Sequence, residues 1–474
     1  MNTTESYDII LLQLPYNFVT PVPGIASLKS NIEKHNFKCK IIDLNYKTIQ
    51  LFKHKYDLKN ILTYKWLDVV STKITDGDKI NEEDKKIFQD IFPIWLDEIN
   101  QYKPKFIGLS VLNVMNLIPF FDIFKDFLIK KCPDSKFVIG GSGLFLNGTA
   151  DKYLKEQNFI DYFIYGDGED AIIKLLNDDY ESINEYQKIT NLDDYPFPDY
   201  TDYPKETLEN LEWLSVISSR GCVRSCNFCW RKYKGFNIKN PDLVIQEMIE
   251  IHEKYKPTKI IFDDSLINAD RLKLNCLLDN IINYNKTIDN PILWNGNFAC
   301  LPVKDSDVVL YKKIKESNNE MLFIGIESGS EKVRRDMHKP LKDYDKYFML
   351  SNLNKNKINV VMGIIIGYYS ETEEDFQETL NFFKWCKNNL DTQHLTITFS
   401  IFSITENSLL WKTAGINYDK NNQWEYKNIN NFPIRYKRLK ETIELSNSLG
   451  INILTPHKDY FSKVNKQYQK KLNE

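Results

Sequence analysis

The sequence predicts an α/β protein with two domains: a doubly wound parallel sheet, then a partial (β/α)6 barrel, followed by a small, mostly helical C-terminal extension. Short apolar runs of strand length alternate with segments of helical spacing through most of the chain. The alternation lapses once near the middle, and 474 residues are too many for a single hydrophobic core. We therefore expect a first domain at 1–180, a linker at 181–211, a second domain at 212–405 and an extension at 406–474.

Five strands are expected in the first domain, at Tyr7–Pro15, Phe37–Leu44, from Lys105, at Ser135–Gly143 and at Asp161–Glu169. Between the first two, Ile25, Leu28 and Ile32 share one helical face. Short apolar strands joined by amphipathic helices are typical of a parallel sheet covered on both faces. The span 48–101 interrupts this rhythm and predicts a helical insertion rich in lysine and aromatic residues.

The second domain follows a segment, "NLDDYPFPDYTDYP", that has three prolines and neither strand nor helix periodicity, which predicts a linker. Strands of the second domain are then expected from Glu212, Thr258, Ile292, Met321, Ile358 and His394. Six strand–helix units suit an incomplete barrel, whose functional face lies at the carboxyl ends of its strands. Beyond Glu406 the pattern weakens and the tail is rich in lysine.

Composition is that of a folded globular protein, with 42% hydrophobic and 27% charged residues and a net charge of −3. A nucleic-acid partner is not expected, because such proteins are usually strongly basic. The N-terminus lacks a signal-peptide pattern, and no apolar stretch has the roughly 18 residues of a membrane span. We therefore expect a cytoplasmic protein, in which clustered cysteines serve as metal ligands or catalysts more often than as disulfides.

Three of the eight cysteines are crowded into "SSRGCVRSCNFCW", directly after the first strand of the second domain. Cys222, Cys226 and Cys229 have the spacing CxxxCxxC, which lets one loop wrap three thiolates around a metal centre. Zinc would need a fourth ligand, and no Cys or His follows before His252. Three cysteines suit a 4Fe–4S cluster that keeps one iron free for another ligand, with a zinc loop as the alternative.

The segment "CVRSCNFC" resembles the signature of radical S-adenosylmethionine (SAM) enzymes. The resemblance covers about Leu214 to Phe402. It implies that the free iron binds the amino and carboxylate groups of SAM. An electron delivered by a donor such as flavodoxin or ferredoxin then cleaves SAM to methionine and a 5′-deoxyadenosyl radical.

The same resemblance implies which residues approach SAM. Phe228 would pack near the adenine, and Glu327 and Ser328 in "FIGIESGS" would approach the ribose or amino group. The backbone of "GIIIGYYSETEEDF", with Gly363 and Gly367, would cradle the adenine. The remaining carboxylates, Asp263 and Asp264, would face the barrel mouth at the end of the second strand.

The first domain resembles the cobalamin-binding domain that precedes many radical SAM cores, over about Tyr7 to Leu176. The resemblance implies a corrin at the carboxyl edge of the sheet, the ligand edge of doubly wound folds. The DxHxxG motif, whose histidine ligates cobalt, is absent, and tight turns in a sheet without a cofactor are the alternative interpretation of its glycines. Expected contacts are Pro15, Tyr16, Ser110, Gly140, Gly141 and Ser142.

Taken together, the two resemblances imply a methyltransferase that acts on an unactivated carbon or phosphorus centre of a small molecule or peptide. Radical cyclisation, rearrangement or carbon–carbon coupling without methyl transfer is the alternative reaction. A non-catalytic iron–sulfur or cobalamin sensor is the alternative of another class. Cys300, just after the third barrel strand, is the one candidate for a catalytic side chain, with a buried inert thiol as the simpler interpretation.

Overall fold

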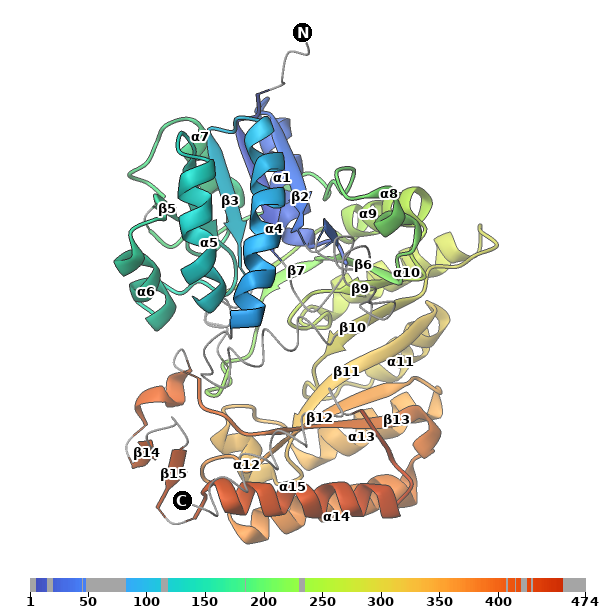
Figure 1. Cartoon of the computed structure of the whole chain (residues 1–474). Coiled ribbons are helices and arrows are strands. Elements are labelled where there is room, and N and C mark those ends of the chain that lie inside the picture. Colours follow the sequence, from blue (N-terminus) through green and yellow to red (C-terminus); the bar gives the residue numbers. More distant parts are fainter. Residues whose placement is uncertain are drawn as a thin grey trace. The chain divides into compact units, whose positions relative to one another are not determined.

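The computed structural model describes residues 6–14, 20–44, 46–47, 82–111, 118–183, 185–229, 235–405, 408–413, 415–418, 424–427 and 429–454. The chain divides into two compact units (Figure 1). The first is Met1–Ser215 with Ile251–Pro257, and the second is Val216–Glu250 with Thr258–Glu474. In the described ranges, no helix is long and apolar enough to cross a membrane.

The first unit is built on a parallel sheet of five short strands, as the sequence predicts. The strands are β1 (Ile9–Gln13), β2 (Cys39–Asp43), β3 (Phe106–Ser110), β4 (Lys136–Gly140) and β5 (Tyr162–Phe163). Their order in the sheet is β2-β1-β3-β4-β5, and every pair is parallel. The order reverses between β1 and β3, and doubly wound sheets bind ligands beside such a reversal.

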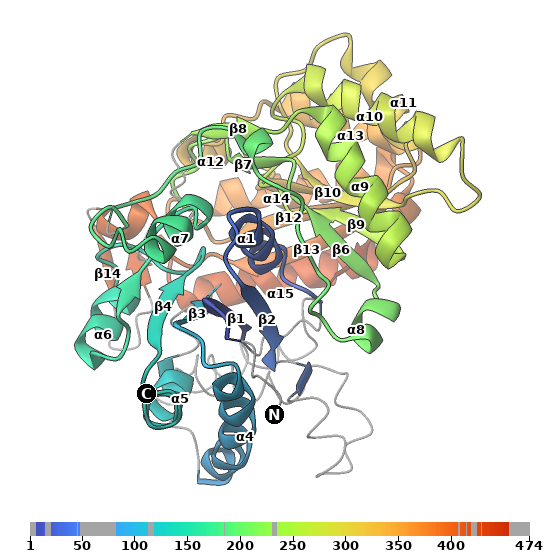
Figure 2. The same cartoon turned by 90° about the horizontal axis from the view of Figure 1, so that it is seen from above.

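Helices cover both faces of this sheet. Figure 2 shows α1 and α7 on one face and α4 and α5 on the other. Their bounds, with that of the shorter α6, are α1 Pro23–Lys34, α4 Glu82–Gln101, α5 Ile118–Lys131, α6 Thr149–Gln157 and α7 Glu169–Leu176. Phe92, Trp95 and Phe124 are buried between the sheet and its helices, with the rings of Phe92 and Phe124 5.0 Å apart.

The expected helical insertion at 48–101 needs a correction in its second part. Helix α4 is the crossover that joins β2 to β3, and its apolar face belongs to the core of the sheet. A parallel pair of strands requires a crossover of this kind, so Glu82–Gln101 is part of the doubly wound fold itself. The first part, 48–81, lies outside the described residues.

The expected linker at 181–211 is wrong as a description of this segment, which packs into the first unit. Ile183 and Tyr200 have no exposed surface, and α8 (Lys205–Glu209) is its short helix. The Tyr203 hydroxyl donates a hydrogen bond of 2.7 Å to the buried side chain of Gln13 in β1, and Lys29 of α1 pairs with Asp199. Prolines set the extended path of this segment, but the aromatic side chains between them are buried.

The barrel sheet lies in the second unit except for the start of β6, and its six principal strands are neighbours in chain order. The order β16-β13-β12-β11-β10-β9-β6 is that of an open barrel, as the sequence predicts. Its strands are β6 (Trp213–Val216), β9 (Lys259–Phe262), β10 (Trp294–Phe298), β11 (Asn319–Glu327), β12 (Val360–Ile366), β13 (Leu395–Ile401) and β16 (Asn452–Ile453). The helices that connect these strands are α9 (Pro241–Tyr255), α10 (Arg271–Asn285), α11 (Asp307–Glu316), α12 (Glu331–Asp336), α13 (Asp343–Lys355) and α14 (Glu373–Asn389).

Among its described residues, the C-terminal extension adds one long helix and three short strands. Helix α15 (Phe432–Ser448) follows an antiparallel pair, β14 (Ile416–Tyr418) and β15 (Trp424–Tyr426). It leads into β16, which pairs in parallel with β13 and so joins the barrel sheet. A second antiparallel pair, β7 (Ser219–Gly221) and β8 (Phe236–Ile238), flanks the cysteine loop.

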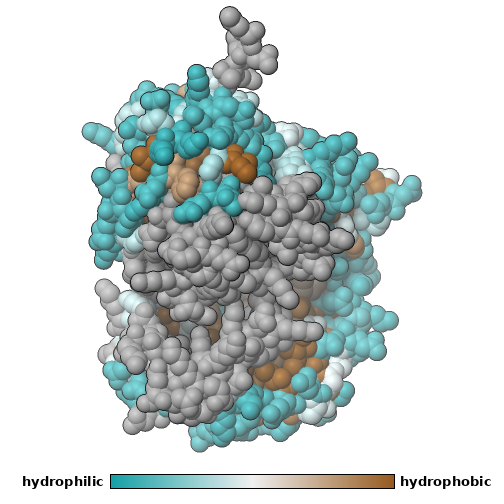
Figure 3. Space-filling model, viewed as in Figure 1, coloured by the Kyte–Doolittle hydropathy of each residue, from teal (hydrophilic) through white to brown (hydrophobic). Residues whose placement is uncertain are grey.

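Figure 3 shows that the coloured surface on one face is mostly hydrophilic, with separate hydrophobic groups.

Candidate cofactor site

The three clustered cysteines lie on the loop that follows β7, close to the carboxyl end of β6. Gly221 turns the chain at the start of this loop with a positive φ of 90°. Cys222, Cys226 and Cys229 are all half-buried thiols, and the Cys229 amide donates to the Cys226 carbonyl at 3.2 Å. Burial raises the pKa of Cys226 to about 11, while the nearby charge of Lys339 opposes this shift. A ligand that binds thiolates must therefore displace the proton of Cys226.

In the described ranges, no three His, Cys, Asp or Glu side chains converge closely enough to hold one metal ion. An iron–sulfur cluster makes a different demand from a single ion, because each cysteine binds a different iron and the sulfurs stand farther apart. A half-buried loop with three thiols and no paired disulfide fits that demand.

Arg224 and Phe228 anchor the two halves of the cysteine loop. The Arg224 guanidinium donates a 2.6 Å hydrogen bond to the carbonyl of Cys300. Phe228 packs against an apolar cluster that includes Tyr368 and Phe402. The Cys300 thiol itself is buried, and burial raises its pKa to about 12. In this structure Cys300 supports the loop through its backbone carbonyl, and its use as a catalytic thiol stays a prediction.

The two aspartates after β9 have separate environments. Asp263 is exposed, and its amide donates to the carbonyl of Val216 at the end of β6. Asp264 is buried and accepts hydrogen bonds from the Ser218 amide at 2.8 Å and from the hydroxyls of Ser218 and Ser219. Asp264 therefore ties the start of the cysteine segment to the end of β9.

Glu327, at the carboxyl end of β11, has an unusual backbone. Its φ is +70°, a left-handed conformation that non-glycine residues adopt at a cost of about 1–3 kcal/mol. The carboxylate accepts a 2.6 Å hydrogen bond from the Lys339 ammonium, and both side chains are largely buried. Glu327 and Lys339 both act electrostatically on Cys226, so this ion pair lies beside the cysteine loop.

Ser328 has no exposed surface, and its hydroxyl lies 3.3 Å from that of Thr379 in α14. The structure therefore turns Ser328 toward the helix layer, away from the side that Glu327 occupies. Arg334 stabilises this turn, because its buried guanidinium donates hydrogen bonds to the carbonyls of Ser328 and Gly329 at 2.8 and 2.7 Å. This network supports the left-handed backbone of Glu327.

The two predicted glycines lie in β12 and directly after it: Gly363 is within the strand and Gly367 begins the turn that follows. A side chain at Gly363 would come within 3.1 Å of the Phe323 ring. Gly367 has a φ of +76°, and a Cβ there would lie 2.4 Å from Cγ of Arg435 in α15. The Gly367 amide donates to the buried carboxylate of Glu371 at 3.0 Å, and Arg438 of α15 pairs with the same oxygen.

Sequence reasoning missed Lys339, Tyr368 and Glu371, which contact or support the predicted residues. The spacing of Glu371 four residues after Gly367 was a usable signal, because a buried carboxylate can satisfy the amide of a tight turn. Nothing in the sequence pattern pairs Lys339 with Glu327.

In the first unit, four of the predicted cobalamin contacts lie near one another at the carboxyl edge of the sheet. Ser110 ends β3 and stands opposite Gly140, which ends β4. Gly141 follows with a φ of +112°, and a Cβ there would lie 2.4 Å from the Val111 carbonyl oxygen. Ser142 is exposed beside them. Pro15 and Tyr16 lie outside the described residues.

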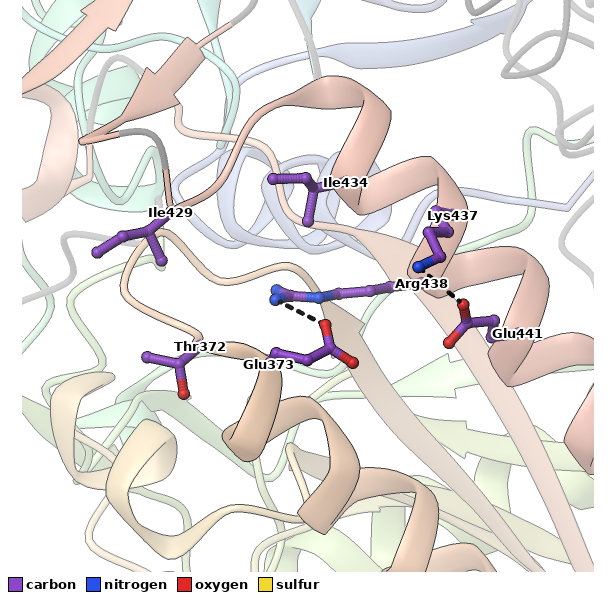
Figure 4. A pocket seen from close by; sticks show the side chains of 7 residues that line it. All are labelled: Thr372, Glu373, Ile429, Ile434, Lys437, Arg438 and Glu441. Atoms are coloured by element: carbon purple, nitrogen blue, oxygen red, sulfur yellow. Dashed lines mark hydrogen bonds and ion pairs between the residues drawn. The ribbon is translucent and has the colours of Figure 1, made fainter.

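A cleft of about 350 Å³ lies in the second unit, and no cysteine lines it. Figure 4 shows Arg438 directed toward Glu373 and Lys437 toward Glu441, so its charged side chains are paired with one another. None of the predicted site residues lines this cleft, which is formed by Thr372, Glu373, Ile429, Ile434, Lys437, Arg438 and Glu441.

Comparison with known proteins finds a family model that matches part of the chain. Residues 216–383 match the model of the radical SAM superfamily. An uncharacterized methyltransferase of Pyrococcus horikoshii is 23% identical over 337 residues, which are 65% of this chain and 69% of that protein. A tRNA-2-methylthio-N6-dimethylallyladenosine synthase of Buchnera aphidicola is 25% identical over 66% of this chain and 75% of its own length.

Two solved structures share the fold over most of the chain. The radical SAM methyltransferase TsrM of Kitasatospora setae, with cobalamin and a 4Fe–4S cluster bound, has a TM-score of 0.63 at 14% identity, covering 87% of this chain and 81% of TsrM. The cobalamin-dependent SAM radical enzyme OxsB, with aqua-cobalamin bound, has a TM-score of 0.59 at 17% identity, covering 86% of this chain and 55% of OxsB. Residues 216–383 are therefore a radical SAM domain, in a chain that has the fold of the cobalamin-dependent radical SAM enzymes TsrM and OxsB.

Proposed function

We propose that this chain is a radical SAM methyltransferase that holds a 4Fe–4S cluster on Cys222, Cys226 and Cys229 and a corrin in its first unit. Its substrate is a small molecule or peptide with an unactivated carbon or phosphorus centre. The single observation that carries the proposal is the three-cysteine loop after the first barrel strand. This loop occurs in a chain of which 87% is covered by the structural match to TsrM.

The residues beside the cysteine loop suit a cofactor with both positive and negative groups. Glu327 presents a carboxylate to hydroxyls or an ammonium, and Lys339 presents an ammonium to a carboxylate. Phe228 offers an apolar ring from within the cysteine loop. When bound, the cluster supplies the electron that cleaves SAM, and the corrin supplies a methyl carrier.

At the edge of the first sheet, the fit to a corrin rests on close backbone approach. Gly140 and Gly141 leave the end of β4 without side chains, and Ser110 and Ser142 add hydroxyls. A nucleotide tail can lie against such a surface, because glycine lets the backbone come close to a ligand. Because the sequence lacks the DxHxxG motif, the proposal includes no histidine ligand to cobalt.

One anaerobic experiment tests the proposal. The protein is reconstituted with iron and sulfide, reduced, and incubated with SAM and hydroxocobalamin, and bound corrin, 5′-deoxyadenosine and S-adenosylhomocysteine are quantified. Formation of both nucleoside products with retained corrin supports methyl transfer. Failure of a fully loaded, reducible cluster to cleave SAM would contradict the proposal and favour a sensor.

Radical chemistry without methyl transfer is a second candidate, and the likeness to OxsB favours it. OxsB is described as a cobalamin-dependent SAM radical enzyme, not as a methyltransferase, and its TM-score of 0.59 is close to that of TsrM. The same experiment separates the two, because this reaction gives 5′-deoxyadenosine without S-adenosylhomocysteine. The matched control is a variant with Cys222, Cys226 and Cys229 replaced by alanine, which is expected to lose iron and SAM cleavage together.

A further inference from the structure

Asn227, between the second and third cysteines, is held by three hydrogen bonds. Its amide donates to the carbonyl of Met337 at 3.1 Å, and its side-chain NH2 donates to the carbonyl of Asp336 at 2.7 Å. Its side-chain oxygen lies 3.0 Å from the hydroxyl of Tyr368. Asn227 is 4% exposed and Tyr368 is fully buried, so water does not compete freely for these bonds.

The donors and acceptors fix the orientation of the Asn227 side-chain amide. The Asp336 carbonyl can only accept, so it must face the NH2 group of Asn227. The side-chain oxygen of Asn227 then faces Tyr368. The Tyr368 hydroxyl lies 3.0 Å from this oxygen and 3.0 Å from the Asp336 carbonyl oxygen, so its one proton is shared between two acceptors of the same site. Carbonyls at the end of a helix have no partner within the helix, and Asn227 satisfies two of them at the end of α12.

Tyr368 connects this arrangement to the turn that the sequence assigns to the adenine of SAM. It follows Gly367 directly, and its own carbonyl accepts a 2.7 Å hydrogen bond from the buried side chain of Asn430. Its ring packs 5.0 Å from that of Phe402 in the cluster that also holds Phe228. The hydroxyl therefore joins two segments that are 141 residues apart in the sequence.

We propose that Tyr368 and Asn227 form a clamp that sets the position of the cysteine loop relative to the turn after β12. This inference rests on the proposed function, in which that loop and that turn hold the cluster and SAM. Tyr368 is then a positioning residue, because its hydroxyl acts on the site through Asn227, which lies between two of the cysteines. Loss of its hydroxyl leaves a buried amide oxygen without a donor and frees the loop to shift.

The test uses the full chain with Tyr368→Phe, which removes the hydroxyl and keeps the ring. Tyr369→Phe is the matched control, because Tyr369 is the next residue, is half-buried and packs 4.8 Å from the Tyr368 ring. Asn227→Asp is the second variant, because its carboxylate cannot donate to the Asp336 carbonyl. Urea unfolding of each variant establishes that it is folded.

The first readout needs no cluster. In metal-free, reduced protein, alkylation of Cys226 by iodoacetamide is followed by peptide mass spectrometry, with the exposed Cys276 as internal reference. We expect Tyr368→Phe and Asn227→Asp to raise the relative rate at Cys226 by on the order of 10-fold, the effect of losing one buried hydrogen bond. Tyr369→Phe is expected to react as the wild type does.

The second readout is the electron paramagnetic resonance spectrum of the reduced, iron-loaded protein during titration with SAM. We expect Tyr368→Phe to keep its iron but to need on the order of 10-fold more SAM for the spectral change. The clamp is refuted if Tyr368→Phe matches Tyr369→Phe in either readout. If the wild type binds no cluster, the proposed function fails, and the alkylation rates still decide whether the clamp holds the loop.

Discussion

At the scale of single residues, Glu327 combines a strained backbone with a carboxylate that forms an ion pair with Lys339. Its φ is +70°, and Arg334 stabilises the next residue by donating a hydrogen bond to the Ser328 carbonyl. The Glu327 carboxylate pairs with Lys339, and both charges act on Cys226. Strain of this kind persists only where the surrounding structure imposes it, and it is common at ligand sites. If the proposed function is right, we expect Glu327 and not Ser328 to be the contact of this turn with SAM, because the Ser328 side chain is buried against Thr379.

Glu327→Gln tests this assignment. It keeps the shape of the side chain and removes the charge that attracts the ammonium or orders the hydroxyls of SAM, so we expect about 10-fold weaker SAM binding. The measurement is the SAM concentration that half-saturates the spectral change of the reduced cluster. Glu320→Gln is the control, because Glu320 is on the same strand and pairs with Lys259 at 3.1 Å. Equal effects of the two variants would contradict the assignment.

Asp264 gives a prediction about pH. Burial raises the pKa of its carboxyl to about 6, against the hydrogen bonds of Ser218 and Ser219, which lower it. Between pH 3.8 and 6 the unfolded chain has lost this proton and the folded chain still holds it. The stability that Asp264 contributes is therefore full below this range, falls by about 1.4 kcal/mol per pH unit within it, and is flat above pH 6.

The measurement compares the free energy of urea unfolding of the wild type with that of Asp264→Asn from pH 4 to pH 7. Asparagine does not titrate, so the difference between the two proteins should shift against the wild type as the pH rises and then level off. A difference that is constant over the whole range would show that the carboxyl of Asp264 has an ordinary pKa in the folded protein.

At the scale of elements, the sequence predicts strands and helices well wherever short-range patterns determine them. Helix α14 begins at Glu373, because Thr372 and Asp375 cap each other across its first turn, and both residues are close together in the sequence. Periodicity cannot show partners that are distant in sequence. Strand β16 has two residues, and its place beside β13 depends on α15 leading the chain back to the sheet. The buried tyrosines of 181–211 were missed because prolines in sequence suggest a loop whether or not it packs.

The candidate site shows the same division. The cysteine loop and its place after a barrel strand follow from spacing and chain order alone. Other contacts of the site join residues that are 12 to 141 positions apart in the sequence. These are the hydrogen bonds of Asp264 with Ser218, of Lys339 with Glu327 and of Tyr368 with Asn227. Such contacts depend on the three-dimensional course of the turns. Patterns in a single sequence do not contain this information.

The turn between β12 and α14 supplies a prediction about an element. Gly367→Ala places a methyl group against Arg435, whose guanidinium is stacked 3.8 Å from the Trp424 ring, and imposes a φ that alanine disfavours. We expect a loss of about 2 kcal/mol or more in the free energy of unfolding, measured in urea. Gly24→Ala is the control: a Cβ at Gly24 meets nothing within 4 Å, and it should change stability by less than about 1 kcal/mol. Equal effects would mean that Arg435 yields to the methyl group.

At the scale of the whole molecule, the chain divides into two units, and the five-stranded sheet and the buried cluster around Phe92 and Trp95 both belong to the first. The predicted corrin contacts Ser110, Gly140, Gly141 and Ser142 all belong to the first unit. The cysteines and the residues expected around SAM all belong to the second. If the proposed function is right, each cofactor is retained by its own unit, and a local defect in one unit should leave the cofactor of the other in place.

Gly141→Ala tests this separation. The added methyl group would meet the Val111 backbone at 2.4 Å and disturb the end of β4, so we expect at least 10-fold weaker corrin retention after gel filtration. Iron content and the yield of 5′-deoxyadenosine should stay at the wild-type level, while S-adenosylhomocysteine should disappear. The converse variant, with the three loop cysteines replaced by alanine, should lose iron and keep the corrin. If either variant loses both cofactors while its circular dichroism is unchanged, retention of cluster and corrin is coupled, and the assignment of one cofactor to each unit is wrong.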